Sequence, residues 1–306
     1  MSQVLKVEQV MKAYNGKVAL DGVSMSVEAG SCFGLLGPNG AGKSTMMKLL
    51  TGILRHDAGS IGVMGMDVGK QAGEIRAKVG YVPQDITLYE KLSARQNLKF
   101  FGEMYGVRGA ELKRRIGQVL ERVGLSDRAD DTVASYSGGM KRRINIAAAL
   151  LHEPKLVILD EPTVGIDPQS RNHIFELLRG LQKEGVTLIY STHYMEEVEA
   201  LCDAVAIIDH GRIITQGPLE ELLEKHALKA VYVETDGWKE APKLAGLQKA
   251  TREGRGWVLE CEQPLDMMGR VSEELSRSGA AVMALEMMKP SLDSVFLKLT
   301  GEKLRD

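Results

Sequence analysis

The stretch "CFGLLGPNGAGKSTMMKLLTG", residues 32–52, decides the fold. An apolar run over 32–36 leads into a glycine-rich segment, and apolar residues at 46, 47, 49 and 50 follow at helical spacing. Gly52 is a typical helix stop. The middle of the stretch, "GPNGAGKST" at 37–45, fits the pattern G-x-x-x-x-G-K-[ST] between the strand and the helix that this pattern requires. The sequence therefore predicts a phosphate-binding loop.

The chemistry of this loop follows from its residue types. Glycines let backbone N–H groups turn toward a β-phosphate, and the helix N-terminus adds partial positive charge. Lys43 can reach the β- and γ-phosphates, and the Ser44 hydroxyl can bind Mg²⁺. The predicted nucleotide-binding residues are Gly37, Pro38, Asn39, Gly40, Ala41, Gly42, Lys43, Ser44 and Thr45.

Two later segments predict strands beside this loop. "KLVILD" at 155–160 and "VTLIYSTH" at 186–193 are continuous apolar runs with a helical pattern between them, which indicates a parallel sheet buried on both faces. Asp160 ends the first strand, where it can hold the water shell of magnesium. Glu161 should point elsewhere from the strand end, where it could act as a general base on an attacking water.

Three further residues carry weaker signals. A lone histidine is more often structural than catalytic, but His193 ends the next predicted parallel strand, where a ligand crevice is expected. Gln84 follows "VGYVP" and could reach magnesium or water, or be an ordinary loop residue. Tyr14 could stack on a base, or it could be a half-buried strand tyrosine.

Composition limits the class of protein. The chain has 306 residues and a net charge of -2, which gives no general attraction to nucleic acid. Its three cysteines, Cys32, Cys202 and Cys261, are far apart and odd in number, which argues against a disulfide framework or a zinc site and is typical of a reducing cytosol. No apolar run approaches the length of a membrane span, so another chain would have to cross a membrane.

The pattern changes after residue 225. "AVYVETDG" and "GWVLECE" predict short strands, a helix is expected over 265–276, and another strand around 281–285. Just before this change, "AVAIIDHGRIITQG" predicts two strands joined by a turn at His210 and Gly211. We therefore expect a large domain over 1–225 and a small α/β appendage over 226–306.

The segment "SYSGGMKRRINIAAALL", residues 135–151, places two glycines before a helix. Glycine is a poor helix former, so the bare backbone suggests that something approaches it closely. The "KRR" at 141–143 is expected to be a solvated or docking surface.

Taken in order, these motifs closely resemble the ATP-binding subunits of ABC transporters over residues 4–225. "YSGGM" at 136–140 is similar to the family signature LSGGQ, and "VGIDP" at 164–168 to the D-loop. The resemblance implies an α/β fold of the P-loop NTPase (RecA-like) type with an antiparallel β subdomain, a helical signature subdomain and a small C-terminal α/β accessory domain. It also implies ATP and Mg²⁺ as cofactors.

The resemblance assigns a role to each candidate. Tyr14 would stack on adenine, Gln84 would be the Q-loop residue, and His193 the switch histidine. Glu161, His193 and Lys43 would be catalytic, and Ser44, Gln84 and Asp160 would hold the metal. In this family two nucleotide domains meet head to tail, so Ser137, Gly138, Gly139 and Asp167 would contact the nucleotide held by a second domain, a copy of this chain or a related one.

Two departures from the family pattern stand at Tyr136 and Met140, and "VGID" replaces the common "SALD". With "MEEVEALCDAVAIIDHGRI" and the tail "SLDSVFLKLTG", they resemble the daunorubicin-resistance and nodulation-factor export branch. That branch implies a separate ABC-2 type membrane permease, docked near "DITLYEKLSARQNLKFF", and a peripheral location on the cytoplasmic side of the cell membrane. We expect the second nucleotide domain to be a copy of this chain, and we expect no nucleic acid partner.

The alternative from another class is a soluble ABC-type mechanical ATPase acting in DNA repair or chromosome organisation. Such chains usually carry long coiled coils or zinc modules between the lysine and the acids, and no heptad run separates Lys43 from Asp160. A P-loop kinase would leave the signature unexplained.

Overall fold

The computed structural model describes residues 3–300. Residues 301–306, which the expected appendage also includes, lie outside the described residues. Contacts divide the chain into two units, one that runs through Leu219 and one that begins at Glu220. The expected boundary between residues 225 and 226 falls at the end of α8 (Leu219–His226). Within residues 3–300, every helix is too short or too polar to span a bilayer.

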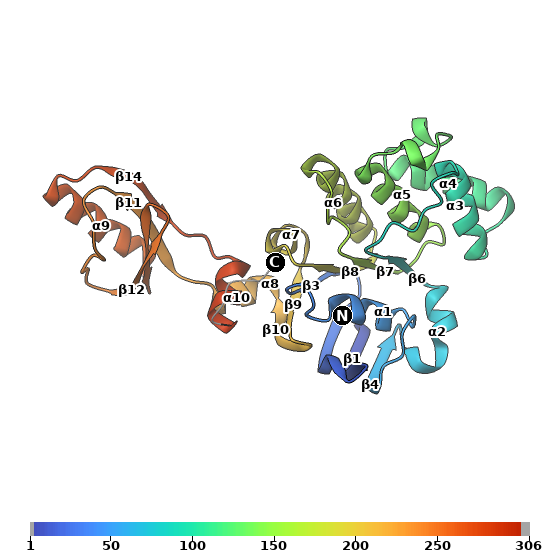
Figure 1. Cartoon of the computed structure of the whole chain (residues 1–306), viewed down its shortest axis with the longest axis horizontal. Coiled ribbons are helices and arrows are strands. Elements are labelled where there is room, and N and C mark those ends of the chain that lie inside the picture. Colours follow the sequence, from blue (N-terminus) through green and yellow to red (C-terminus); the bar gives the residue numbers. More distant parts are fainter. Residues whose placement is uncertain (1–2, 301–306) are drawn as a thin grey trace. The chain divides into compact units, whose positions relative to one another are not determined.

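A central sheet in the first unit has the strand order β10-β9-β3-β8-β7-β6 (Figure 1). Its parallel strands are β3 (Cys32–Leu36), β6 (Val79–Val82), β7 (Leu156–Asp160), β8 (Thr187–Thr192) and β9 (Ala204–Asp209). β3, β7 and β8 are buried at every position, as expected of strands covered on both faces. The predicted parallel sheet is confirmed, and β8 lies between β3 and β7.

The helices after β3 and between β7 and β8, and the hairpin of β9 and β10, follow the prediction, whereas the helix between β8 and β9 was not predicted. α1 (Lys43–Leu50) follows β3, α6 (Pro168–Lys183) joins β7 to β8, and α7 (Met195–Leu201) joins β8 to β9. β9 and β10 (Arg212–Pro218) form an antiparallel hairpin. Its turn residues, His210 and Gly211, have φ values of 46° and 75°, which is the backbone that a tight hairpin turn requires.

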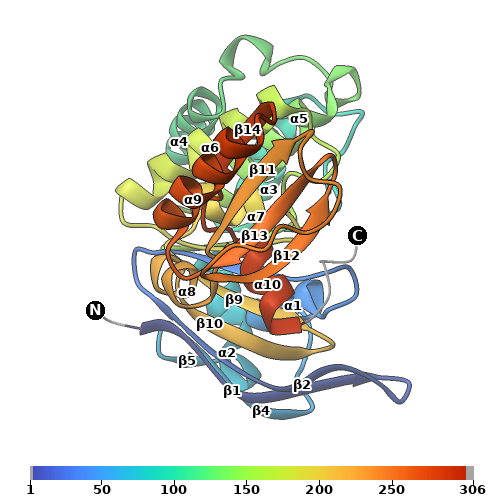
Figure 2. The ribbon, with the colours of Figure 1, turned by 90° about the vertical axis from the view of Figure 1, so that its left-hand side faces the viewer.

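A second, antiparallel sheet packs with α1. Its strands are β1 (Gln3–Tyr14), β2 (Lys17–Glu28), β4 (Ala58–Val63) and β5 (Met66–Asp67), in the order β2-β1-β4-β5, and α2 (Val68–Arg76) follows them. Figure 2 shows β1, β2 and β4 side by side. Val10 and Leu20 from this sheet share one core with Met46 and Leu49 of α1 and with Ile189 of β8. This core fixes α1, and with it the loop before α1, against both sheets.

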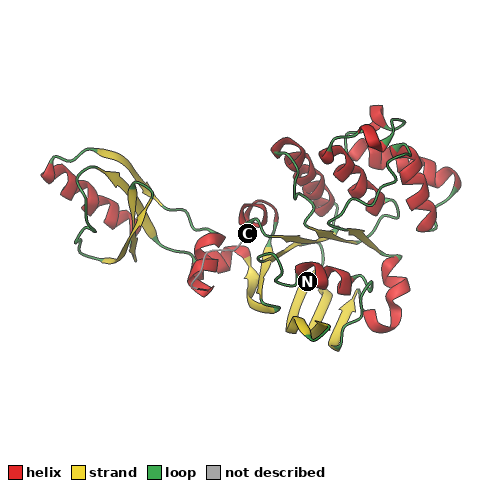
Figure 3. Ribbon diagram, viewed as in Figure 1, coloured by secondary structure: helices red, strands yellow, loops and turns green. Residues whose placement is uncertain are grey.

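Residues 94–150 form a mostly helical segment of the first unit. The helices are α3 (Ala94–Met104), α4 (Gly109–Arg122) and α5 (Gly138–Leu150), with two short 3-10 turns, η1 (Ser126–Arg128) and η2 (Val133–Ser135). Ser93 caps α3 through a reciprocal pair of hydrogen bonds with Gln96. Figure 3 shows these helices together in red on one side of the first unit.

The second unit is a four-stranded antiparallel sheet in the order β12-β13-β11-β14. Its strands are β11 (Ala230–Thr235), β12 (Leu247–Glu253), β13 (Gly256–Cys261) and β14 (Val282–Met287), and its further helices are α9 (Pro264–Ser278) and α10 (Leu292–Thr300). Met267 and Val271 of α9 pack on Val231, Val233 and Leu259. Three of the four strands were predicted. β12 was missed because "LQKATRE" is a polar edge strand with no buried position.

Candidate active site

The predicted phosphate loop joins β3 to α1 and runs close to neighbouring backbone. A Cβ on Gly37 would lie 2.1 Å from the carbonyl oxygen of Ile208. Gly42 has a φ of 110°, and a Cβ there would lie 2.7 Å from the carbonyl oxygen of Ala19. Glycine is therefore required at both positions by close backbone approach, and at Gly42 also by a left-handed conformation.

The first turn of α1 faces this loop. Gly42 is its N-cap and supplies no side-chain hydrogen bond, so the first amide groups of α1 are left for another acceptor. Ser44 and Thr45 are half-buried in this turn, whereas Asn39 and Gly40 are exposed. Free amide groups at a helix N-terminus form a typical binding site for an anion.

The Lys43 ammonium lies inside the loop with 4% of the residue exposed. Its Nζ donates hydrogen bonds to the carbonyl oxygens of Gly37 and Pro38 at 2.7 and 3.0 Å. It also forms an ion pair with Oε1 of Glu161 at 3.0 Å. The lysine thus links the loop to the acid at the end of β7.

Glu161 is held in an unusual backbone conformation, with a φ of 45°. Its N–H donates to the carbonyl and hydroxyl oxygens of Ser191, both at 3.1 Å. The left-handed backbone turns its side chain away from the line of the strand, at a cost of roughly 1–2 kcal/mol. The positive φ of Glu161 therefore explains why the side chains of Asp160 and Glu161 are expected to point in different directions.

The Glu161 carboxylate gathers the other candidates. Besides Lys43, it accepts a hydrogen bond at Oε2 from Gln84 Nε2 at 3.3 Å. Nδ1 of His193 lies 3.4 Å from the same oxygen, although without hydrogen-bond geometry. Glu161 is 4% exposed, so these charges act on one another with little screening by solvent. We name Lys43, Gln84, Glu161 and His193 the carboxylate cluster.

Asp160 lies beside this cluster and is 1% exposed. Its Oδ1 accepts hydrogen bonds from Ser44 Oγ at 3.1 Å and from Ser191 Oγ at 2.8 Å. Burial raises the pKa of Asp160, while the two serine hydroxyls oppose that shift and the charge of Glu161 adds to it. Ser44 and Asp160 together offer the oxygen ligands that Mg²⁺ prefers. Ser191, which contacts both acids, was not predicted; its only signal is its place before His193 in "YSTH".

The signature residues form a second group, at the start of α5. Ser137 is the N-cap, and its Oγ accepts a hydrogen bond from the N–H of Met140 at 3.3 Å. A Cβ on Gly139 would lie 2.1 Å from Ser170 Oγ, so packing against α6 requires this glycine. Asp167 caps α6 by accepting from the N–H of Ser170 at 2.9 Å. The described contacts of Ser137, Gly139 and Asp167 are with α5 and α6, and the structure does not bring them to the carboxylate cluster.

Gly138 differs from Gly139. A Cβ on Gly138 would lie 4.0 Å from Ile166 Cδ1, which is ordinary contact. Packing within the described chain therefore does not require glycine at 138. Tyr136, where the family usually has leucine, is buried and donates its hydroxyl to the carbonyl oxygen of Arg128.

The expectation that "KRR" is a surface is wrong at its middle residue. Arg142 is 3% exposed, and its guanidinium donates to the carbonyl oxygens of Pro83, at 2.8 Å, and Gln84. Burial of this charge is satisfied by backbone acceptors that no local pattern reveals. Arg142 thus fixes the segment that presents Gln84 to Glu161.

Tyr14 is the last residue of β1 and is 42% exposed. Lys12 Nζ lies 5.6 Å from the centre of its ring. Base stacking by Tyr14 stays a prediction.

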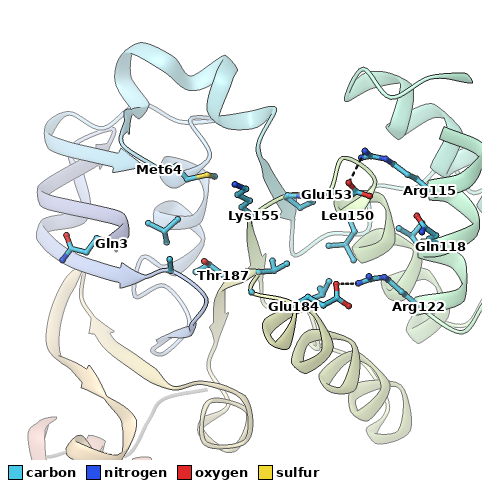
Figure 4. A pocket seen from close by; sticks show the side chains of 17 residues that line it. Gln3, Met64, Arg115, Gln118, Arg122, Leu150, Glu153, Lys155, Glu184 and Thr187 are labelled. Atoms are coloured by element: carbon cyan, nitrogen blue, oxygen red, sulfur yellow. Dashed lines mark ion pairs between the residues drawn. The ribbon is translucent and has the colours of Figure 1, made fainter. Parts of the chain in front are cut away.

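A cavity of about 730 Å³ lies at the amino ends of the central parallel strands, away from the carboxyl ends that carry the carboxylate cluster (Figure 4). Lys155 and Thr187, at the starts of β7 and β8, line it, whereas Asp160 ends β7. Ion pairs between Arg115 and Glu153, at 3.2 Å, and between Arg122 and Glu184, at 2.9 Å, already neutralise its arginines. The cavity is therefore separate from the carboxylate cluster.

A parallel sheet with β8 between β3 and β7, a glycine loop before α1 and acids at the end of β7 define a P-loop nucleotide-binding protein. Comparison with known proteins agrees with this class and narrows it. The sequence profile of the ABC transporter family matches residues 20–164. Because relatives of 36–44% identity also match almost the whole chain, the chain belongs to the family of ABC transporter ATP-binding proteins.

Relatives match over almost the full length. The linearmycin resistance ATP-binding protein LnrL of Bacillus subtilis is 44% identical, with 99% of this chain and 100% of the relative covered. The Nod factor export ATP-binding protein I of Sinorhizobium fredii is 38% identical, with coverage of 99% and 87%. The daunorubicin/doxorubicin resistance ATP-binding protein DrrA of Streptomyces peucetius is 36% identical, with coverage of 100% and 94%. The resemblance to the resistance and Nod factor export branch is confirmed.

Solved structures match most of the chain. The structure of cbiO1 from Clostridium perfringens, part of the ABC transporter complex cbiONQ, has a TM-score of 0.67 and 34% identity, covering 74% of this chain and 92% of that chain. A dimeric structure of the ATP-binding cassette MJ0796 bound to ADP and Pi has a TM-score of 0.65 and 25% identity, covering 70% and 98%. The predicted fold class is confirmed.

The two signature glycines should respond differently to alanine. Gly139→Ala forces a Cβ against Ser170 and should destabilise the chain by about 1–3 kcal/mol. Gly138→Ala makes only an ordinary contact with Ile166 and should stay within about 0.5 kcal/mol of the wild type. Urea denaturation of the full-length variants measures both, and equal destabilisation would contradict the packing described for α5 and α6.

Proposed function

We propose that this chain is the ATP-binding and ATP-hydrolysing subunit of an exporter. The observation that carries the proposal is the convergence of Lys43, Gln84 and His193 on the buried carboxylate of Glu161, next to the pair formed by Ser44 and Asp160. These residues come from four separate places in the sequence, and their chemistry suits phosphoryl transfer.

The phosphates would lie against the loop at 37–45 and the first turn of α1. Lys43 would exchange its contacts with two carbonyl oxygens and Glu161 for phosphate oxygens. Ser44 and Asp160 would hold Mg²⁺, which neutralises charge on the phosphate oxygens when bound. The Gln84 amide nitrogen donates to Glu161, so its amide oxygen would be free to bind the metal. Tyr14 would stack on the adenine.

For hydrolysis, Glu161 would orient a water molecule and take its proton as general base. Lys43 and His193 would stabilise the charge of the phosphoryl group during transfer. Because Lys43 and Glu161 are almost completely buried, these interactions act in a medium of low effective dielectric, where they are stronger than in water.

The signature residues would serve a second nucleotide domain, with a homodimer as the proposed assembly. Ser137 and Gly138 are exposed at the N-terminus of α5, where the helix supports an anion. Gly138 has no packing reason to be glycine within the described chain, which supports close approach by another molecule. Asp167 stands next to this surface. ATP would then contact both subunits, whereas ADP would lose the contact to the signature.

Transport would be carried out by a separate membrane permease, which we propose is of the ABC-2 type. The relatives are named for resistance and for Nod factor export, which supports export by this chain. An apolar cavity of about 620 Å³ beside the Gln84 segment is lined by Ile53, Pro83, Phe101 and Met104, and 69% of Met104 is exposed. A cytoplasmic helix of the permease would dock there, which would place this chain on the cytoplasmic side of the cell membrane.

The comparisons support transport over the alternative of a mechanical ATPase in DNA repair or chromosome organisation. The relatives that match almost the whole chain are named for resistance or for export. The expected absence of a nucleic acid partner stays a prediction. The second unit, beginning at Glu220, is proposed as an accessory domain of the same subunit.

Glu161→Gln should keep ATP binding and lose turnover. The change preserves shape but removes the base, so kcat should fall by about 10²–10⁴-fold. ATP should then hold two chains together, as seen by gel filtration. Glu184→Gln, at an exposed acid paired with Arg122, is the matched control and should hydrolyse ATP normally. An undiminished rate in Glu161→Gln would refute the general-base role.

Ser137→Ala should weaken ATP-driven dimerisation by about tenfold, because one hydrogen bond to charged phosphate is lost. Binding of nucleotide by the monomer should change little. Since Ser137 also caps α5, Ser93→Ala, which removes the cap of α3, controls for lost helix capping. Sedimentation of the variants with MgATP tests this, and equal loss of both properties would mean that the signature acts within its own subunit.

A further inference from the structure

Glu197, on α7, carries a carboxylate to which none of the predicted motifs assigns a role. The residue is 1% exposed. A charge buried this deeply is costly unless hydrogen-bond donors surround it. Its surroundings therefore show what it holds in place.

Three hydrogen-bond donors and one cation converge on this carboxylate. Oε1 accepts a hydrogen bond from Thr163 Oγ1 at 2.7 Å, and Arg171 Nε lies 3.6 Å from the same oxygen. Oε2 accepts from Thr192 Oγ1 at 2.7 Å and from the Tyr190 hydroxyl at 2.9 Å. Burial, followed by the charge of Glu197, raises the pKa of Tyr190, so this hydroxyl stays protonated and can donate. Both carboxylate oxygens are satisfied.

These donors belong to the elements that present the candidate site. Thr192 directly precedes His193, and its carbonyl oxygen accepts from the N–H of Gly37 at 3.3 Å. Thr163 lies in the segment between Glu161 and Asp167, and Arg171 lies on α6, which Asp167 caps. One carboxylate therefore ties the end of β8, with His193, to the segment that ends at Asp167.

A second route leads from the same carboxylate to His193. The Arg171 guanidinium lies 5.8 Å from the centre of the Tyr194 ring. The Tyr194 ring lies 4.1 Å from the imidazole of His193, centre to centre. The two neighbours of His193 in the chain, Thr192 and Tyr194, are thus both linked to Glu197, Thr192 directly and Tyr194 through Arg171.

We propose that Glu197 is a positioning residue for ATP hydrolysis. Its charge fixes His193 and the segment leading to Asp167 in one arrangement. The position of His193, which acts within this chain, is therefore coupled to the position of Asp167, which faces a second chain. A site held in this way needs little rearrangement when charge develops in the transition state. The inference rests on the proposed function and adds to it a residue outside the nucleotide contacts.

Glu197→Gln in the full-length chain tests the inference. The amide keeps the shape, but it replaces one acceptor oxygen with a donor that faces other donors. We expect kcat for MgATP to fall about 10–100-fold through misplacement of the site. The affinity for MgADP should stay within about threefold, because Glu197 contacts none of residues 37–45 in the described structure. Glu196→Gln, at the exposed neighbour on the same helix, should leave both values unchanged.

Two threonine variants keep the inference testable if Glu197→Gln does not fold. Thr163→Val and Thr192→Val each remove one donor, and each should lower kcat with MgADP affinity retained. The double variant should lose less than the product of the single effects, because both hydroxyls act through one carboxylate.

The outcomes separate this inference from the proposed function. Wild-type hydrolysis with unchanged kcat in the folded variants would overturn the role of Glu197 alone. Parallel loss of MgADP affinity and kcat would also overturn it, since that result assigns Glu197 to folding. A wild-type chain that does not hydrolyse ATP would overturn the proposed function and this inference with it.

Discussion

The buried ion pair between Lys43 and Glu161 is the interaction on which the candidate site depends. Both residues are almost completely excluded from water, so neither charge can lose its partner without a replacement. A phosphate oxygen is such a replacement for Lys43, and His193 and Gln84 remain beside Glu161. The pair therefore holds the loop and the acid together, and a bound phosphate would release Glu161 from Lys43.

The strand order explains how residues distant in sequence reach this pair. β8 lies between β3 and β7, so the loop after β3 and the acids after β7 flank the end of β8. Ser44 and Asp160, 116 positions apart, meet at 3.1 Å. Ser191, at the end of β8, binds both Asp160 and Glu161, and Glu197 supports the same strand end through Thr192. The middle strand thus organises the site although neither motif lies on it.

Much of this could be predicted from local sequence, because the loop and the buried strands depend on patterns within a few residues. The positive φ of Glu161, the hydroxyl of Ser191 and the buried Arg142 were not predicted, since each depends on a partner far along the chain. Glu197 was hidden for the same reason, as "MEEVE" reads as an ordinary acidic helix face. The polar β12 lacked the apolar alternation that reveals a strand.

The most direct test of the account is the release of phosphate from MgATP by the full-length chain, measured beside Lys43→Ala. The wild type should hydrolyse ATP, with hydrolysis stopped when EDTA removes Mg²⁺. Lys43→Ala should be at least about a hundredfold slower, because it removes both the partner of Glu161 and the charge that stabilises the phosphoryl group. Equal rates for the two proteins would contradict the central claim that this buried pair forms the hydrolytic site.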